Sequence, residues 1–158
     1  MQLILMRHAE AGPYVPDDAH RKLTERGHTQ AADSAGKLVG LYRPQLLIVS
    51  PYDRARQTAN HVLDAYAKLN HAIRTVVCDN ITPDDDPVQG LNEIYRIHES
   101  HGSPDGVLVV CHMPIVARMA QLLTGAYHDD GFALAEFRAY QTEYIAEGLA
   151  RQIQQYHP

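Results

Sequence analysis

Long hydrophobic runs are missing from this chain of 158 residues. The first apolar stretch, Gln2 to Met6, is too short for the hydrophobic region of a signal peptide and has no basic segment before it. No later apolar stretch approaches the length that spans a bilayer. We therefore expect a cytoplasmic protein that makes no membrane contact.

Cysteine is also scarce, since Cys78 and Cys111 are the only two in the chain. Two cysteines in a chain of this size indicate reduced thiols rather than a disulfide framework. The spacings HExxH, paired CxxC and the EF-hand loop do not occur, so the ten histidines give little reason to expect a metal site. We expect no metal and no other cofactor.

Positive charge is in deficit, with 14 Lys and Arg against 19 Asp and Glu, a net charge of −5 and a pI near 6.0. This balance disfavours a nucleic-acid partner, because binding to the phosphate backbone needs a basic surface. Any anionic ligand must instead meet a local cluster of basic side chains. The length predicts a single domain over residues 1–158, large enough to bury a core.

Apolar runs alternate with stretches of helical periodicity along the chain. Helices are predicted from Thr24 to about Leu41, from Pro51 through Tyr66, after Pro87 through His98, and from Pro114 to Gly125. Strands are predicted at residues 3–6, 46–49, 73–77 and 106–112, with weaker ones at 132–137 and 150–156. The alternation indicates an α/β fold, a three-layer α/β/α sandwich around a mainly parallel sheet.

Three of the predicted strands end in groups that suit an anion. Arg7 and His8 follow residues 3–6, Ser50 to Arg54 follow residues 46–49, and Cys111 and His112 end the run that begins at Gly106. The carboxyl ends of neighbouring parallel strands meet at one edge of a sheet, where ligands bind in open α/β folds. If these strands are neighbours, two histidines and two arginines share a pocket.

This set of residues favours phosphoryl transfer, which depends on positioning and charge neutralisation. A neutral imidazole attacks phosphorus, and a guanidinium offers a planar fork of donors for phosphate oxygens. Arg54 lies in the first turn of a predicted helix, where the amide dipoles also favour an anion. The alternative is that these are ordinary surface side chains at strand ends. Cys111 is disfavoured as a nucleophile, because its side chain and that of His112 point in opposite directions.

Four segments carry a resemblance to a known family. They are Leu5-Met-Arg-His-Ala-Glu, Leu23-Thr-Glu-Arg-Gly, Ser50-Pro-Tyr-Asp-Arg-Ala-Arg-Gln-Thr-Ala and Val109-Val-Cys-His-Met-Pro, in this order. The chain resembles the histidine phosphatase superfamily, also called phosphoglycerate mutase-like. Because the chain is short, it is most similar to the SixA-type phosphohistidine phosphatases of that superfamily. The resemblance implies a phosphoglycerate mutase-like fold.

The resemblance also implies roles for individual residues. His8 is the nucleophile that becomes phosphorylated, Arg7 and Arg54 bind the phosphoryl group, and His112 completes the anion pocket. Arg21, just before Leu23, is implied as a further phosphate contact, with an exposed loop arginine as the alternative. The implied enzyme is a metal-independent phosphatase.

The acidic proton donor of larger relatives has no obvious counterpart here. The short segment that replaces their insertion holds Asp84, Asp85 and Asp86, which are either candidate proton donors or a solvated loop. A weak acid suits a phosphoramidate, whose imidazole leaving group needs less protonation than an alkoxide. We therefore expect the substrate to be a protein with a phosphohistidine domain. The alternatives are a phosphomonoesterase or mutase acting on a small phosphorylated molecule, and a non-catalytic phosphate-binding module.

Overall fold

The computed structural model describes residues 1–127 and 130–158, and its strands form a single sheet with the order β3-β2-β4-β1-β5-β6. The strands are β1 (Gln2–Arg7), β2 (Leu46–Val49), β3 (Arg74–Val77), β4 (Gly106–Cys111), β5 (Phe137–Gln141) and β6 (Arg151–Tyr156). The helices are α1 (Glu25–Leu41), α2 (Asp53–Ala67), α3 (Pro87–Ser100) and α4 (Ile115–Thr124), with a short 3-10 turn, η1, at Asp18–His20.

The sheet is mainly parallel, as predicted. Strands β3, β2, β4 and β1 run parallel to one another, whereas β5 is antiparallel to β1 and β6 is antiparallel to β5. Strand β4 lies between β1 and β2 and pairs with both along its length. The carboxyl ends of β1, β4 and β2 therefore lie side by side.

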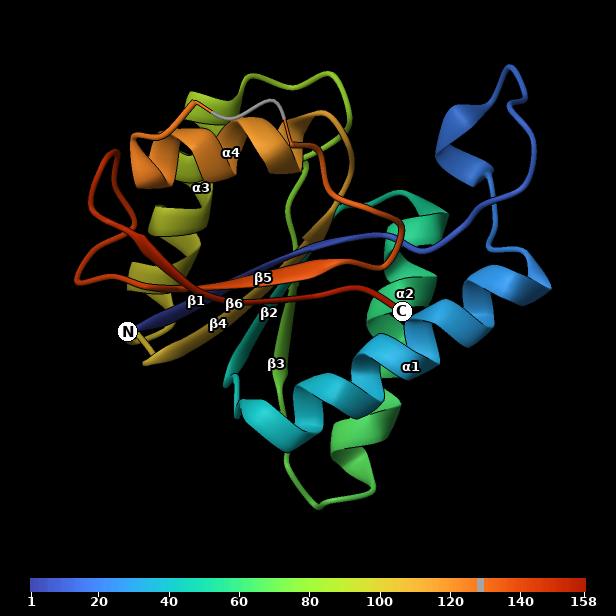
Figure 1. Ribbon diagram of the computed structural model, residues 1–158, viewed down its shortest axis with the longest axis horizontal. Coiled ribbons are helices and arrows are strands. Elements are labelled where there is room, and N and C mark those ends of the chain that lie inside the picture. The colour runs from blue at the N-terminus through green and yellow to red at the C-terminus, as the bar shows by residue number, and fades with distance from the viewer. Residues whose placement is uncertain (128–129) are drawn as a thin grey trace.

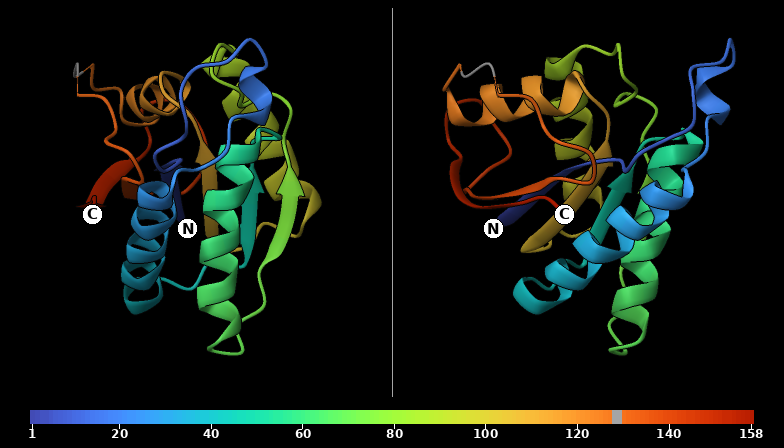
Figure 2. Two further views of the ribbon diagram at one scale, coloured as in Figure 1. Left: turned by 90° about the vertical axis from the view of Figure 1, so that its right-hand side faces the viewer. Right: turned by 45° about the vertical axis from the view of Figure 1, so that its right-hand side comes forward.

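Helices cover both faces of the sheet and give the predicted three-layer sandwich (Figures 1 and 2). Alternation along the strands divides the core, because successive side chains of a strand point to opposite faces. Leu3, Leu5, Val107 and Val109 pack with α3 and α4. The intervening residues of the same strands, with Ile4 and Met6 among them, pack with α1 and α2.

Capping residues explain where α1 and α3 begin and where α4 ends. The hydroxyl of Thr24 accepts the amide of Gly27 and caps α1, and the Asp86 carboxylate accepts the amides of Val88 and Gln89 and caps α3. Gly125, with φ of 66°, ends α4 in the left-handed conformation. The predicted start of α2, with Pro51 near the first helical position, lies slightly early, since the helix begins at Asp53 and Pro51 lies in the bend that separates it from β2.

The predicted strand at residues 132–137 is also misplaced. β5 runs from Phe137 to Gln141, and residues 132–136 form a loop. Phe132 is buried in this loop, where its ring centroid lies 4.1 Å from the guanidinium carbon of Arg138. Tertiary packing of the loop thus buries an apolar side chain that, in the sequence, suggests a strand.

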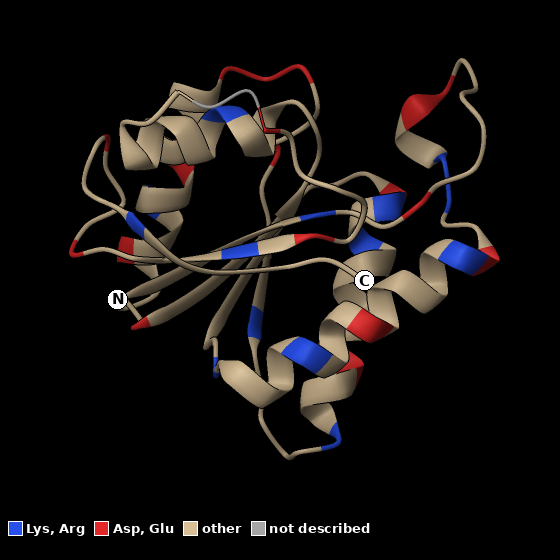
Figure 3. Cartoon of the chain, in the orientation of Figure 1, with Lys and Arg blue, Asp and Glu red and all other residues tan. Residues whose placement is uncertain are grey.

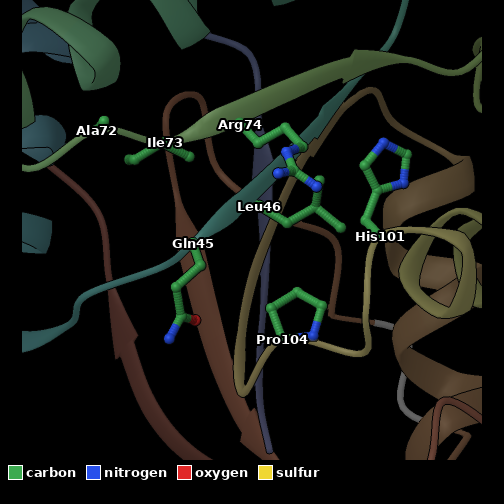
Figure 4. Close-up of a pocket in the computed structure, with 7 residues that line it drawn as sticks. All are labelled: Gln45, Leu46, Ala72, Ile73, Arg74, His101 and Pro104. Atoms are coloured by element: carbon green, nitrogen blue, oxygen red, sulfur yellow. The ribbon is translucent and has the colours of Figure 1, made fainter.

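An open cavity of about 470 Å³ lies at the amino ends of β2 and β3. Gln45, Leu46, Arg74 and His101 are among the residues that line it (Figure 4). Because β2 and β3 are parallel, this cavity is at the opposite end of the sheet from the residues that follow the strands. In the part of the chain that the structure describes, no helix is long and apolar enough to cross a membrane.

Candidate active site

The ends of β1, β4 and β2 bring the predicted residues together through strand register. Arg7 pairs with Cys111, and the amide of His8 donates to the carbonyl of Cys111 at 3.0 Å. The amide of Ser50 donates to the carbonyl of Val110 at 3.0 Å. His8 and His112 consequently leave adjacent strands at the same level, and their ring centroids are 5.2 Å apart.

Two hydrogen bonds define the tautomer of His8. Its Nδ1 lies 2.7 Å from the carbonyl oxygen of Ala9, and this oxygen accepts only, so Nδ1 carries the proton. Its Nε2 lies 3.2 Å from Nε of Arg54, which donates only, so Nε2 carries the lone pair. Both contacts select the same neutral imidazole, with Nε2 as its nucleophilic atom.

Burial and neighbouring cations keep both histidines neutral. Desolvation is the main cause that lowers the pKa of His8 to about 3, with Arg54, Arg7 and Arg21 adding to it and the bond to Ala9 opposing it. Desolvation likewise lowers the pKa of His112 to about 2, helped by His8, Arg54 and Arg7. An uncharged His8 retains its lone pair at neutral pH.

Ser50 holds His112 from the end of β2. Oγ of Ser50 lies 2.6 Å from Nε2 of His112 and also accepts the amide of Tyr52 at 3.4 Å. The serine hydroxyl can donate to Nε2, and in that arrangement the His112 proton lies on Nδ1. That Nδ1 is buried and has no hydrogen-bond partner among the residues that the structure describes.

Arg7 is held by the loop before β5. Its NH1 donates to the carbonyl of Phe132 at 2.7 Å, and its backbone amide donates to the carbonyl of Glu136 at 2.9 Å. Within residues 1–127 and 130–158, its buried Nε has no hydrogen-bond partner. A buried donor without a partner costs about 1–3 kcal/mol, so the unpaired donors of Arg7 and His112 indicate a site for an acceptor such as an oxyanion.

Arg54 projects from the first turn of α2 and is 3% exposed. Tyr52 covers it, with the ring centroid 5.1 Å from the guanidinium carbon of Arg54 and 5.1 Å from the centroid of the His112 ring. Thr58, one turn along α2, donates from its hydroxyl to the carbonyl of Arg54 and accepts the amide of Ala9. This hydroxyl couples α2 to the segment that carries His8.

Arg21 completes the basic cluster, and the carboxylate of Asp18 connects it to Arg54. Arg21 donates from Nε and NH2 to the carbonyl of Gly12, and from NH1 to Oδ1 of Asp18 at 3.0 Å. Asp18 also accepts from Arg54, so the loop that carries η1 is attached to the site. Figure 3 shows basic positions at the end of β1, at the start of α2 and after η1, with acidic positions interleaved.

Sequence reasoning missed the contributions of Asp18, Ser50 and Thr58. The helical spacing from Arg54 to Thr58 and the place of Ser50 at a strand end are signals that point to two of them. Asp18 has no such signal, because it lies in a short 3-10 turn and its partner Arg54 is distant in the sequence.

The three candidate proton donors lie before α3. Asp85 accepts from the amide and hydroxyl of Thr82, and Asp86 caps α3, whereas Asp84 is exposed. These contacts stabilise the local turn and do not join the carboxylates to His8. Among the described residues, no three His, Cys, Asp or Glu side chains are grouped to hold a metal ion.

Known proteins are similar to this chain in sequence and in fold. A family model for the histidine phosphatase superfamily (branch 1) matches residues 3–75. The chain is 32% identical over 127 residues to the phosphohistidine phosphatase SixA of Escherichia coli (strain K12), covering 79% of this chain and 76% of that protein. The chain belongs to the histidine phosphatase superfamily, and it is a phosphatase.

Solved structures are similar over nearly the whole chain. The protein histidine phosphatase SixA complexed with tungstate superposes with a TM-score of 0.86 at 25% identity, over 100% of this chain and 97% of that one. A putative phosphohistidine phosphatase SixA from Nakamurella multipartitia superposes with a TM-score of 0.77 at 26% identity, over 99% of this chain and 95% of that one. The fold is that of the SixA and phosphoglycerate mutase-like proteins.

Proposed function

We propose that this protein is a metal-independent protein phosphohistidine phosphatase that works through a phosphohistidine intermediate on His8. The observation that carries the proposal is the presentation of His8, whose Nδ1 proton is held by the carbonyl of Ala9 while Nε2 faces Arg54. A residue that only bound an anion would gain nothing from a fixed lone pair. The similarity to a phosphohistidine phosphatase supports the substrate class.

In the first step, the lone pair on Nε2 of His8 attacks phosphorus. A new P–N bond forms as the P–N bond of the substrate breaks, and the departing imidazole keeps the electron pair and takes up a proton from solvent water. The hydrogen bond from Arg54 to Nε2 has to break for this attack. The guanidinium then turns its donors to the phosphoryl oxygens, where charge must be held in the transition state.

In the second step, water attacks phosphorus and the bond to Nε2 breaks. Inorganic phosphate leaves and neutral His8 is restored. Arg7, Arg54 and His112 hold the phosphoryl oxygens in both steps, and the donors of Arg7 and His112 that lack partners among the described residues are suited to this work. Arg21 adds positive charge from the loop before α1.

The experiment uses EDTA-treated protein, phosphoramidate and a protein domain phosphorylated on histidine. We expect phosphate release with both substrates, faster with the protein, and acid-labile phosphate on His8 by mass spectrometry. His8→Ala should abolish turnover. An exposed histidine outside the site provides the control, His157→Ala, which should retain it.

Other outcomes separate the alternatives. Preference for an unactivated alkyl phosphate over phosphoramidate would indicate a small-molecule phosphomonoesterase or mutase. Phosphate binding without turnover or labelling would indicate a binding module. Substantial activity in His8→Ala would exclude the phosphohistidine route.

A further inference from the structure

The carboxylate of Asp18 bridges two arginines of the site, Arg21 and Arg54, which come from different segments of the chain. Its Oδ2 accepts from NH2 of Arg54 at 3.1 Å, and its Oδ1 accepts from NH1 of Arg21 at 3.0 Å. The backbone carbonyl of Asp18 also accepts from NH1 of Arg54 at 2.7 Å. Partial burial opposes ionisation, but the bonds from Arg21 and Arg54 outweigh it and lower the pKa of Asp18.

Asp18 uses donors that a phosphoryl group also needs. Three N–H groups of Arg54 are engaged, one by His8 and two by Asp18. The side chain of Arg54 is only 4% exposed, whereas that of Asp18 is 30% exposed. The carboxylate, which is the more exposed of the two groups, is therefore the partner that can yield to an incoming anion.

The charges around His8 support the same conclusion. Arg7, Arg21 and Arg54 all act on His8, and the carboxylate bonded to two of them is Asp18. Glu136 also lies near Arg7, but its carboxylate is bonded to Arg138 at 2.6 Å. The three arginines and the one carboxylate carry a net charge of about +2, which matches the charge of a phosphoryl dianion. Without the Asp18 carboxylate, the positive charge of the site would exceed the negative charge of that dianion.

We propose that Asp18 sets the affinity of this site for phosphate, by competing for Arg54 and offsetting one positive charge, so that the inorganic phosphate product is held weakly enough to leave. The proposal rests on the proposed function, in which inorganic phosphate is the product. Asp18 is a positioning and charge-setting residue here, since it acts through Arg54 and Arg21.

The test is Asp18→Asn, which keeps the size of the side chain and one oxygen acceptor but removes the charge. We expect the dissociation constant for inorganic phosphate, measured by calorimetry at low salt, to fall by about tenfold. The KM for phosphoramidate should fall with it, while kcat should not rise. The difference should shrink at about 1 M salt, where exposed charges are screened.

The control is Asp17→Asn, which makes the same charge change one residue away. Asp17 is exposed and pairs with His20 rather than with an arginine of the site, so phosphate affinity should change less than about twofold. Asp18→Glu, which restores the charge, should bind phosphate more weakly than Asp18→Asn.

Unchanged or weaker phosphate binding in a folded Asp18→Asn protein would overturn the proposal, because it would make Asp18 a support for Arg54 rather than its competitor. Equal tightening in Asp17→Asn would do so as well, since net charge alone would then explain the effect. The calorimetric result does not need turnover, so a failure of the phosphatase assay is read separately.

Discussion

Nε of Arg54 donates a hydrogen bond of 3.2 Å to Nε2 of His8, the atom whose lone pair attacks phosphorus in the proposed mechanism. The same contact holds the nucleophile neutral and places a guanidinium where the phosphoryl group arrives. It also means that Arg54 has to exchange partners during the reaction. The nucleophile His8 and the phosphate-binding residue Arg54 are therefore hydrogen-bonded to each other before the substrate binds.

Replacing Arg54 by Ala should lower kcat/KM by about a hundredfold or more, the usual loss when one charge contact to a transition state is removed. Arg56→Ala is the matched control, because Arg56 is exposed two residues further along α2. Steady-state kinetics on phosphoramidate checks both variants. A loss of only two- or threefold for Arg54→Ala would place this arginine outside the transition-state contacts.

Acidification should destabilise the protein through His8 and His112. Their folded-state pKa values of about 3 and about 2 lie below the unfolded value of about 6.5. Their stabilising contribution is complete above pH 6.5, and it is lost as pH falls toward 3, because the unfolded chain binds the protons first. Each group adds a slope of up to about 1.4 kcal/mol per pH unit in this window.

Urea unfolding at pH 7.5, 5.5 and 4.5 measures this effect, with His112→Gln as the comparison. The variant should lose less free energy of unfolding than the parent between pH 7.5 and 4.5, because one depressed pKa is gone. Parallel losses in the two proteins would show that His112 titrates normally in the folded state.

Alkylation should leave the activity of the folded enzyme unchanged. Burial raises the pKa of Cys111 to about 12, and its side chain lies in the core beneath α3 and α4, on the other face from His112. Cys78 is buried as well, and its pKa is also raised, chiefly by burial. Iodoacetamide should modify both thiols only in urea. Inactivation in step with modification of Cys111 in the native protein would instead favour a cysteine nucleophile.

Local sequence signals predicted the elements that carry the site, but not how loops join them. The unbroken apolar run at residues 46–49 located β2, because a strand buried on both faces has no polar positions. Thr24 located the start of α1, because its hydroxyl satisfies an amide that the first helical turn leaves unpaired. These signals are short in range, so they fix individual elements and the residues at their ends.

The start of β5 and the contact between Asp18 and Arg54 could not be predicted, because both depend on tertiary packing. β5 contains the buried Arg138, bonded to Glu136, so the strand lacks the apolar pattern that identifies its neighbours. The bond from Arg54 to Asp18 joins positions 36 residues apart and depends on how η1 packs against the start of α2. Such contacts arise from tertiary packing and leave no local periodic pattern.

Gly27 lets α1 pack against the segment that follows His8, and a side chain there should damage both stability and activity. A Cβ at Gly27 would lie 2.0 Å from the carbonyl oxygen of Glu10, which accepts the amide of Thr24 at 3.0 Å. Gly27→Ala should therefore lower the free energy of unfolding by about 1–3 kcal/mol and reduce kcat by shifting the backbone beside His8. Gly36→Ala, in the same helix with nothing within 4 Å of the added atom, should raise stability by about 0.5–1 kcal/mol and leave kcat unchanged. Denaturant unfolding and kinetics on both variants distinguish a packing clash from a general effect of alanine, and equal responses would contradict the close approach of α1 to Glu10.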